Sequence, residues 1–477
     1  MSDLAELHIA ALHARAADRG IAGYRLLRRE ELIAALGRES GPAAEPAVRE
    51  APREGMTDEG AREGTPGERR PRRRGGRGLR RSPEGGGSEL LAGRRTPGEE
   101  ADTDELEALA PAEEGERRAE GERAAGEAEE APTEEVRGVL ELTRQRFGFL
   151  RLRGLAPAEG DVYISASQIR RCELRPGDEV VGPARAARRG ERHRALTHVD
   201  RVNGGEPSED GARPHFDSLD PVLPERRVPL DGEAADLLVR SVDLLAPLAL
   251  GQRVLIRAAP RSGRTTLLRG IARAAGAVEN AKLIVLLIDE RPEEATAWRE
   301  ALSDAEFAIA TSELAPIEQM RTAELAIERA RRLAESGADA ILVCDSLSRL
   351  AVAAGDAGEV KRLFGSGRNL SGGGSLTVLA TVVADAGDEG EAERAVISTE
   401  SALVTLDPDL AADGVHPAID PAGCRVSNED YLRTPDELAA SRRLRSQLAE
   451  LDPAEAAKLL RERIEGSTSN AELLGSL

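Results

Sequence analysis

Residues 258–266 have the composition and the setting of a phosphate-binding loop. They are AlaAlaProArgSerGlyArgThrThr, placed after an apolar run and before a helical pattern. A tight turn containing glycine at such a junction directs backbone N–H groups and the start of the helix at phosphate oxygens. Arg264 stands where the usual pattern has lysine and keeps the positive charge, while Thr265 keeps a hydroxyl that suits Mg²⁺. The predicted nucleotide-binding residues here are Pro260, Arg261, Ser262, Gly263, Arg264, Thr265 and Thr266.

Acidic residues end two apolar runs farther along the chain. Residues 283–288 are followed by Asp289 and Glu290, and residues 340–344 are followed by Asp345. A carboxylate in the first position could orient and activate an attacking water molecule, and Asp345 could hold Mg²⁺ through water. The order of loop, Glu and Asp at these spacings predicts a site for a nucleotide and Mg²⁺. The alternative is a structural relic that no longer binds nucleotide.

The aromatic residues are few and concentrated. The chain has five Phe, three Tyr and one Trp, and Phe147, Phe149 and Tyr163 lie in one short segment. In ArgPheGlyPheLeuArg, Phe147, Phe149 and Arg151 alternate and therefore project from one face of a strand. Exposed rings beside arginine form a platform on which unpaired bases stack. The segment predicts a surface for single-stranded RNA. The alternative is that the same face packs in a barrel core.

The pattern of apolar residues predicts two folded parts that position these motifs. Between 136 and 204, β-like segments are separated by Gly, Pro and Arg turns, which predicts a small barrel of the OB or cold-shock type. The segments are 139–143, 147–152, 161–164, 179–181 and 196–202. From residue 230 onward, apolar strands alternate with helical stretches, which predicts an α/β fold with a parallel sheet. The strands expected there are 254–257, 283–288, 340–344 and 376–382, with helices at 267–275, 316–336 and 434–477.

The expected domains are an N-terminal helical domain (1–40), a disordered linker (41–135), the barrel (136–204), a connector (205–229) and the α/β domain with C-terminal helices (230–477). The linker lacks aliphatic periodicity and is first rich in Arg and Gly, at 68–82, and then acidic, at 99–135. It is interpreted as a solvated linker. The alternative is an auxiliary RNA contact, since guanidinium groups pair with phosphates and stack on bases.

Composition argues against several classes of protein. No apolar run approaches the roughly 18 residues that a membrane span needs, and the N-terminus lacks a signal-peptide layout, so we expect a cytoplasmic protein with no membrane partner. Cys172, Cys344 and Cys424 are widely spaced, which argues against a disulfide framework and a zinc site. The net charge of −20 argues against a protein that coats nucleic acid through its overall charge, but it allows local basic surfaces.

Together these motifs resemble the family of bacterial Rho transcription termination factors along nearly the whole chain. LeuIleAspGluArgProGluGlu (287–294) and SerGlnIleArgArgCysGluLeuArgProGlyAsp (167–178) are the most specific stretches. The resemblance implies a RecA-like P-loop motor domain that hydrolyses ATP, preceded by an OB/cold-shock barrel that captures single-stranded, C-rich RNA. It also implies a homohexamer ring that pulls RNA through its channel, dislodges RNA polymerase from the elongation complex and so terminates transcription.

The resemblance also implies roles for individual residues. The RNA-binding positions of the family fall on Phe147, Phe149, Arg151, Tyr163 and Glu191. The catalytic positions fall on Glu290 and Arg264, and Arg425, two residues from the arginine-finger position, could take the role of the finger after a small shift. Thr265 and Asp345 take the Mg²⁺ positions, and Asp345 and His416 complete the nucleotide-binding set. Arg291 and Arg349 match the family as well.

The motor departs from the family pattern at several positions. Ala258 replaces a glycine, Gly414 replaces an arginine, and Ser427 occupies the finger position. The family places a lysine in each of two channel loops. Neither the shortened loop at 351–360 nor IleSerThrGluSer at 397–401 carries one, and this loss should weaken the binding of RNA phosphates.

These departures leave two hypotheses about function. One hypothesis is a working RNA-dependent ATPase and translocase. The other is an RNA-binding Rho paralogue with weak or lost ATPase and translocation, acting as a binding or regulatory module.

Overall fold

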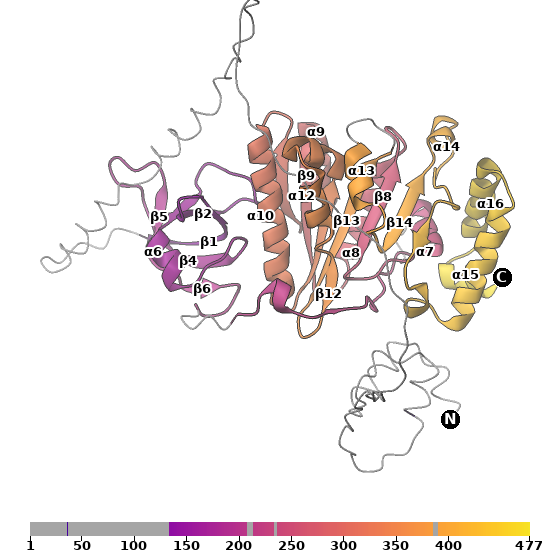
Figure 1. Cartoon of the computed structure of the whole chain (residues 1–477), viewed down its shortest axis with the longest axis horizontal. Helices are drawn as coiled ribbons and strands as arrows, with labels where there is room; N and C mark the ends of the chain where they lie inside the picture. Colours follow the sequence, from indigo (N-terminus) through magenta and orange to yellow (C-terminus); the bar gives the residue numbers. More distant parts are fainter. Residues whose placement is uncertain (1–35, 37–132, 208–212, 233–235, 385–389) are drawn as a thin grey trace, which may run out of the picture. The chain divides into compact units, whose positions relative to one another are not determined.

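The computed structural model describes residue 36 and residues 133–207, 213–232, 236–384 and 390–477 (Figure 1). The helical domain expected at 1–40 and the linker expected at 41–135 lie outside the described residues, apart from Leu36 and residues 133–135. Among the helices that the structure describes, none has the length and apolar character needed to cross a membrane.

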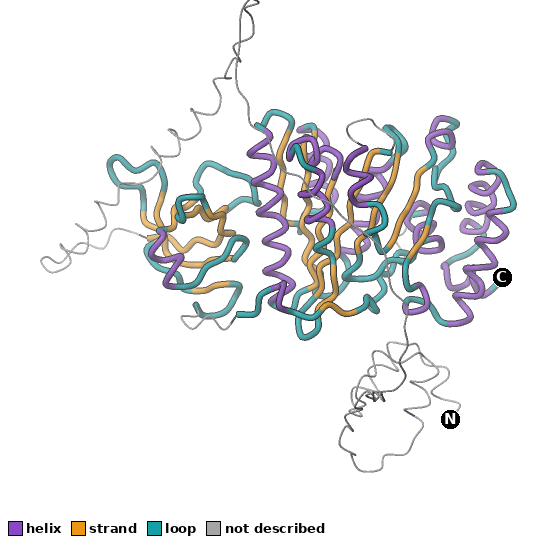
Figure 2. Tube along the Cα trace, viewed as in Figure 1, coloured by secondary structure: helices purple, strands orange, loops and turns teal. Residues whose placement is uncertain are grey.

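A small β-barrel is built from six short strands. They are β1 (Thr133–Leu142), β2 (Gly148–Arg151), β3 (Val162–Ile164), β4 (Glu179–Arg185), β5 (Arg194–Leu196) and β6 (Arg201–Val202). They pair in the order β1-β2-β3-β5-β4, and β1 also pairs with β4, so five strands close and β6 extends β4. Leu140, Leu150 and Val162 fill the interior. The barrel expected from the sequence is confirmed (Figure 2).

The strand expected at 196–202 is divided in two. The N–H groups of Thr197 and Asp200 donate to the carbonyl oxygens of Pro183 and Val181 at 2.9 and 2.8 Å. Between Leu196 and Arg201, four residues (197–200) face two residues of β4 (182–183), and the two extra residues bulge out of the ladder. The bulge ends β5 and lets β6 begin at Arg201.

A helix that the sequence analysis did not predict, α6 (Ala166–Arg171), follows β3. The Ser165 hydroxyl accepts from the N–H of Gln168, and the Gln168 side chain accepts from the N–H of Ser165. This reciprocal capping box satisfies N–H groups that a helix leaves without internal partners.

The second part of the chain is built on a nine-stranded sheet. Its strands are β7 (Pro221–Val222), β8 (Arg253–Ala258), β9 (Ala281–Glu290), β10 (Glu306–Thr311), β11 (Asp339–Asp345), β12 (Arg368–Leu370), β13 (Ser375–Val383), β14 (Ala402–Leu406) and β15 (Arg425–Val426). The order is β10-β9-β11-β13-β8-β14-β15, in which every pair from β10 to β14 is parallel. Continuous apolar runs form these strands because both faces of a parallel sheet are covered.

Helices cover both faces of this sheet (Figure 1). They are α7 (Leu237–Leu245), α8 (Arg264–Gly276), α9 (Pro292–Ala301), α10 (Pro316–Glu335), α11 (Leu347–Ala354), α12 (Ala357–Phe364), α13 (Gly390–Val396), α14 (Pro408–Ala412), α15 (Pro435–Ala449), α16 (Pro453–Glu465) and α17 (Asn470–Gly475). Val285 and Leu287 of β9 belong to the buried cluster that includes α7, α8, α9 and the C-terminal helices, whereas Ile284 and Leu286 belong to the cluster that includes α10 to α13. The predicted α/β architecture is confirmed.

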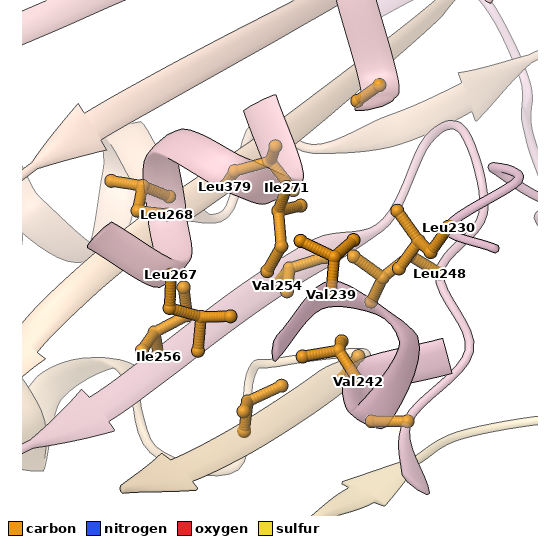
Figure 3. Close-up of a cluster of buried hydrophobic side chains, with 14 of the residues drawn as sticks. Leu230, Val239, Val242, Leu248, Val254, Ile256, Leu267, Leu268, Ile271 and Leu379 are labelled. Atoms are coloured by element: carbon orange, nitrogen blue, oxygen red, sulfur yellow. The ribbon is translucent and has the colours of Figure 1, made fainter. Parts of the chain in front are cut away.

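The packing of β8 against α7 and α8 fixes the loop between β8 and α8. Val254 and Ile256 of β8 lie in one buried cluster with Leu267 and Ile271 of α8 and Val239 of α7 (Figure 3). All five side chains are nearly or fully inaccessible to solvent. The strand and the helix on either side of the loop are therefore held in place by tightly packed apolar contacts.

Candidate functional site

The loop predicted to bind phosphate connects β8 to α8. Gly263 precedes α8 with φ of +87°, a left-handed conformation that glycine adopts without steric cost. The Ser262 hydroxyl donates to the Ala259 carbonyl at 3.0 Å and closes the turn. Pro260, Arg261, Ser262 and Gly263 lie in the loop, and Arg264, Thr265 and Thr266 form the first turn of α8. Because a first helical turn has N–H groups without intrahelical partners, this junction can receive an anion.

Asp345 is the centre of a buried polar cluster at the end of β11. It is fully buried, and its two carboxylate oxygens accept hydrogen bonds at 2.8 Å from the hydroxyls of Thr265 and Thr381. The Arg264 Nε lies 3.7 Å from Asp345 Oδ1, while Arg264 Nη1 is buried without a hydrogen-bond partner in the described chain. The guanidinium thus balances the carboxylate charge and keeps one donor uncommitted.

The pair of Thr265 and Asp345 fits what Mg²⁺ requires of a protein at a nucleotide site. Mg²⁺ takes one or two oxygen ligands from the chain and completes its shell with phosphates and water. The described residues hold no group of three or more His, Cys, Asp or Glu side chains that could bind a metal by themselves. A cation here would therefore depend on phosphate oxygens supplied by a nucleotide.

Glu290 ends β9, which is the neighbour of β11 in the sheet. Its side chain is buried, forms an ion pair with Arg349 of α11, and accepts from the Arg291 N–H at 3.2 Å. Asp289 has φ of +51° and is skipped in the pairing of β9 with β10, so its side chain is exposed. Of the two carboxylates that follow this strand, the structure turns Glu290 inward and Asp289 outward.

The carboxyl ends of neighbouring parallel strands bring these residues to one edge of the sheet. Glu290 and Asp345 end adjacent strands, and the loop after β8 lies beyond β13 on the other side of β11.

Two buried cysteines, Cys344 and Cys424, have thiols that stay protonated at neutral pH. Burial, and then the charge of Asp345, raises the pKa of the Cys344 thiol, and burial raises the pKa of Cys424 to about 12.

Among the described residues, His416 and Arg425 form no hydrogen bond or ion pair with Asp345, Glu290 or the phosphate loop. His416 is exposed in the connection after α14, near Ile419, which bridges to Leu406 at the end of β14. Arg425 is on β15 opposite Leu403 and forms an ion pair with Glu400 of its own chain. Leu403 lies three residues before Leu406, which pairs with Ala258 at the end of β8, so Arg425 is set back along the sheet from the loop of its own chain.

The aromatic residues of the barrel pack against each other. Phe147 and Phe149 are only 5% and 7% exposed, so the prediction of an exposed pair is wrong. The Phe149 ring centroid lies 5.9 Å from that of Phe147, 6.2 Å from Tyr163 and 4.9 Å from His193, and these contacts cover it. The rings are nevertheless outside the apolar interior, which Leu150 enters from the opposite face of β2. They form an aromatic cluster on the outer face of the barrel.

Two charged residues beside the aromatic cluster are engaged in ion pairs. Arg151 pairs with Glu141 and, at 2.5 Å, with Asp161, and its guanidinium lies 5.6 Å from the Phe149 ring centroid. Glu191 accepts from Arg185 at 2.6 and 2.8 Å and from the Arg188 N–H at 2.8 Å. The hydrogen bond from Arg185 holds the pKa of Glu191 below its usual range, against the opposing effect of burial.

Sequence reasoning missed two residues of these clusters. Thr381 holds the second oxygen of Asp345 and interrupts the apolar run of β13 with a hydroxyl, which was a visible signal. His193 covers the Phe149 ring from a loop 44 residues away, and no local pattern indicates that contact.

Comparisons with known proteins match both parts of the chain. The family model described as "Rho termination factor, RNA-binding domain" matches residues 136–208, and "ATP synthase alpha/beta family, nucleotide-binding domain" matches residues 239–365. Three proteins named transcription termination factor Rho are similar to this chain over 62% to 72% of its length. The protein of Bacillus subtilis is 39% identical over 318 residues, covering 62% of this chain and 74% of that protein. That of Aquifex aeolicus is 35% identical, covering 72% and 84%.

The protein of Streptomyces lividans is 37% identical over 363 residues, covering 71% of this chain and 51% of that protein. The chain therefore spans about half the length of this relative, and 64% of the length of the Mycobacterium tuberculosis relatives.

Proposed function

The chain belongs to the family of Rho transcription termination factors, and from that membership we propose that it binds single-stranded RNA and couples RNA binding to ATP hydrolysis in order to terminate transcription. The observation that carries this proposal is the convergence of the phosphate loop, Asp345 and Glu290 at one edge of the sheet. A barrel with an aromatic cluster on its outer face precedes this site in the same chain.

In the proposed ATP site, the N–H groups at the start of α8 and the Arg264 guanidinium would hold the phosphates. Arg264 Nη1 is the donor with no partner in the described chain, so it can turn to a phosphate oxygen. Thr265 and Asp345 would hold Mg²⁺, which neutralises phosphate charge in such reactions. Glu290 would orient the attacking water, and Arg349 keeps its carboxylate in place.

In the proposed RNA site, the edges of Phe147, Phe149 and Tyr163 and the flanking arginines would meet the bases and phosphates. Arg151 stays beside the Phe149 ring because Glu141 and Asp161 hold it there. Glu191 is held by Arg185 at the neighbouring end of β4, where its remaining acceptor capacity can meet base amino groups. RNA binding would thus use side chains whose positions are fixed by ion pairs before RNA arrives.

We further propose a homohexamer ring that acts on the RNA polymerase elongation complex. Arg425 is set back along the sheet from the loop of its own chain and is exposed, which suits a residue that serves a neighbouring subunit. An arginine supplied by a neighbour can stabilise the charge of the phosphoryl-transfer transition state.

A second candidate function is RNA capture with weak or lost hydrolysis and translocation. It is favoured by one specific observation: Arg425 is paired with the buried carboxylate of Glu400 in its own chain. An arginine committed in this way would have to break an ion pair before it served a neighbouring site.

Steady-state ATP hydrolysis with and without poly-C RNA, beside a direct RNA-binding titration, separates the two functions. A working motor should show RNA-stimulated turnover that Glu290→Gln reduces by about 100-fold or more, the usual contribution of a positioned catalytic base. Tight RNA binding without turnover would support the second function. Absence of both nucleotide and RNA binding would contradict both proposals.

A further inference from the structure

A groove lies where the loop after β2 meets α9 and β10. It has a volume of about 590 Å³, and its walls include Arg153, Thr296, Arg299, Glu306 and Phe307. A single nucleotide fits within this volume, since small-molecule sites begin at about 300 Å³. None of these residues belongs to the nucleotide site or to the aromatic cluster described above.

The wall contributed by the loop after β2 is firmly attached. Gly154 has φ of +86°, and a Cβ atom there would lie 2.7 Å from the carbonyl oxygen of Phe307. The N–H of Leu155 donates to the same carbonyl at 2.8 Å, and the Leu155 side chain is buried among the apolar residues of the sheet. The groove is therefore held open by backbone contacts and buried packing.

The groove presents uncommitted positive charge. Arg153 and Arg299 are exposed, and within the described part of the chain neither has an ion pair or a hydrogen-bond partner. Glu306 is the acidic residue of the walls, and Arg329 compensates its charge at 2.8 Å. In contrast, Arg151 is engaged by two carboxylates. The groove thus adds two free guanidinium groups to the exposed arginines that flank the aromatic cluster.

An aromatic surface accompanies this charge. The Arg299 guanidinium lies 5.9 Å from the centroid of the Phe307 ring, which is half-buried on β10. A guanidinium and a ring placed together offer flat surfaces to a base and cationic donors to phosphate, a combination that recognises unpaired nucleotides.

We propose that this groove is a second contact for single-stranded RNA, which receives the nucleotides that leave the aromatic cluster. Arg153 follows Arg151 by two residues at the end of β2, so one continuous segment of chain joins the cluster to the groove. The groove also reaches Pro292 and Thr311, which flank Glu290 in sequence and in strand pairing. The inference rests on the proposed RNA-binding function, because it names the path of the same ligand.

The test compares oligocytidylates of increasing length, from about 4 to about 16 nucleotides, the range of site sizes known for OB folds. The full-length protein is compared with the double variant Arg153→Ala/Arg299→Ala. The matched control is Arg442→Ala/Arg443→Ala, which removes the same charge from two exposed arginines of α15. Affinity for the shortest RNA should be equal in all three proteins, and affinity for the longest should fall about fivefold in the groove variant alone.

Salt dependence and crosslinking give independent readouts. Loss of two phosphate contacts should reduce the slope of log affinity against log salt by about 1.4 for the long RNA only. RNA with 4-thiouridine at one end should crosslink within residues 292–307. If the groove variant shows the same dependence of affinity on RNA length as the unaltered protein, and the crosslinks lie elsewhere, the groove does not bind RNA. The proposed RNA site on the barrel would be unaffected by that result. Failure of every RNA length to bind the unaltered protein would overturn the proposed function as well.

Discussion

Phe149 serves the packing of the barrel as well as the surface that we propose for RNA. Its ring touches Phe147, Tyr163 and His193 and is 7% exposed, so Phe149→Ala should leave a void. We expect a loss of about 3 kcal/mol in unfolding free energy together with weaker oligocytidylate binding, measured by urea unfolding and by titration. Leu223→Ala, at a side chain 43% exposed, should change neither quantity. If Phe149→Ala weakens oligocytidylate binding without changing the free energy of unfolding, the result would instead support the exposed platform that the sequence predicted.

Glu191 should make the stability of the barrel depend on pH. Since Arg185 lowers the pKa of this carboxyl, their pairing stabilises the fold at pH above the ordinary carboxyl pKa and is lost as the pH falls through the lowered value. Glu191→Gln should therefore melt about 1–2 °C below the unaltered protein at neutral pH, a small gap because the pair is partly exposed. The gap should close in acid. If the difference in melting temperature is the same from neutral to acid pH, the effect of Glu191→Gln comes from packing and not from the charge of Glu191.

At the scale of elements, Arg329 of α10 ties the barrel to the sheet. It is 4% exposed and donates to Glu179 of β4 at 3.1 Å and to Glu306 of β10 at 2.8 and 2.9 Å. Arg329→Met would leave Glu306 without a cation and Glu179 with Arg137 alone, so we expect a loss of about 3 kcal/mol and faster hydrogen exchange in β4 and β10. Arg321→Met, on the same helix but without an ion pair among the described residues, is the control.

A double variant separates charge from packing at this junction. Adding Glu306→Gln to Arg329→Met removes the carboxylate that is left without a cation and should recover part of the lost stability. If the double variant is as unstable as the sum of both single changes, the three side chains act independently and the tie between α10, β4 and β10 is not electrostatic.

The elements that could be predicted are those fixed by local composition. The apolar run of β9 is buried on both faces, and the turn at Gly263 requires a left-handed residue, so both are visible in the sequence. The burial of Phe149 could not be predicted, because its neighbours Tyr163 and His193 come from other segments. The choice of Glu290 over Asp289 also depends on a backbone conformation at the end of β9 that no residue type specifies.

At the scale of the whole molecule, the segment 397–401 decides between the two proposed functions. The family places a lysine here, but this chain has none. Arg253 of β8 donates to the Thr399 carbonyl at 2.5 Å, and Glu400 pairs with Arg425. The segment is thus fastened to β8 and β15 on either side. A ring of such subunits would present hydroxyl and apolar side chains to RNA, which grip phosphates poorly.

Ile397→Lys tests whether this is what limits the motor. The resemblance in the sequence implies a channel lysine at Ile397, which is 37% exposed, so a lysine should be accommodated there without loss of stability. In a working motor, displacement of a DNA strand from an RNA–DNA hybrid should rise on the order of fivefold, equivalent to about 1 kcal/mol of added phosphate attraction, while ATP turnover changes little. Leu223→Lys adds the same charge elsewhere and should have no effect. If the unaltered protein hydrolyses ATP and the lysine variant still displaces no strand, the missing channel charge does not limit the motor. In that case the ion pair between Arg425 and Glu400 is the next site to change.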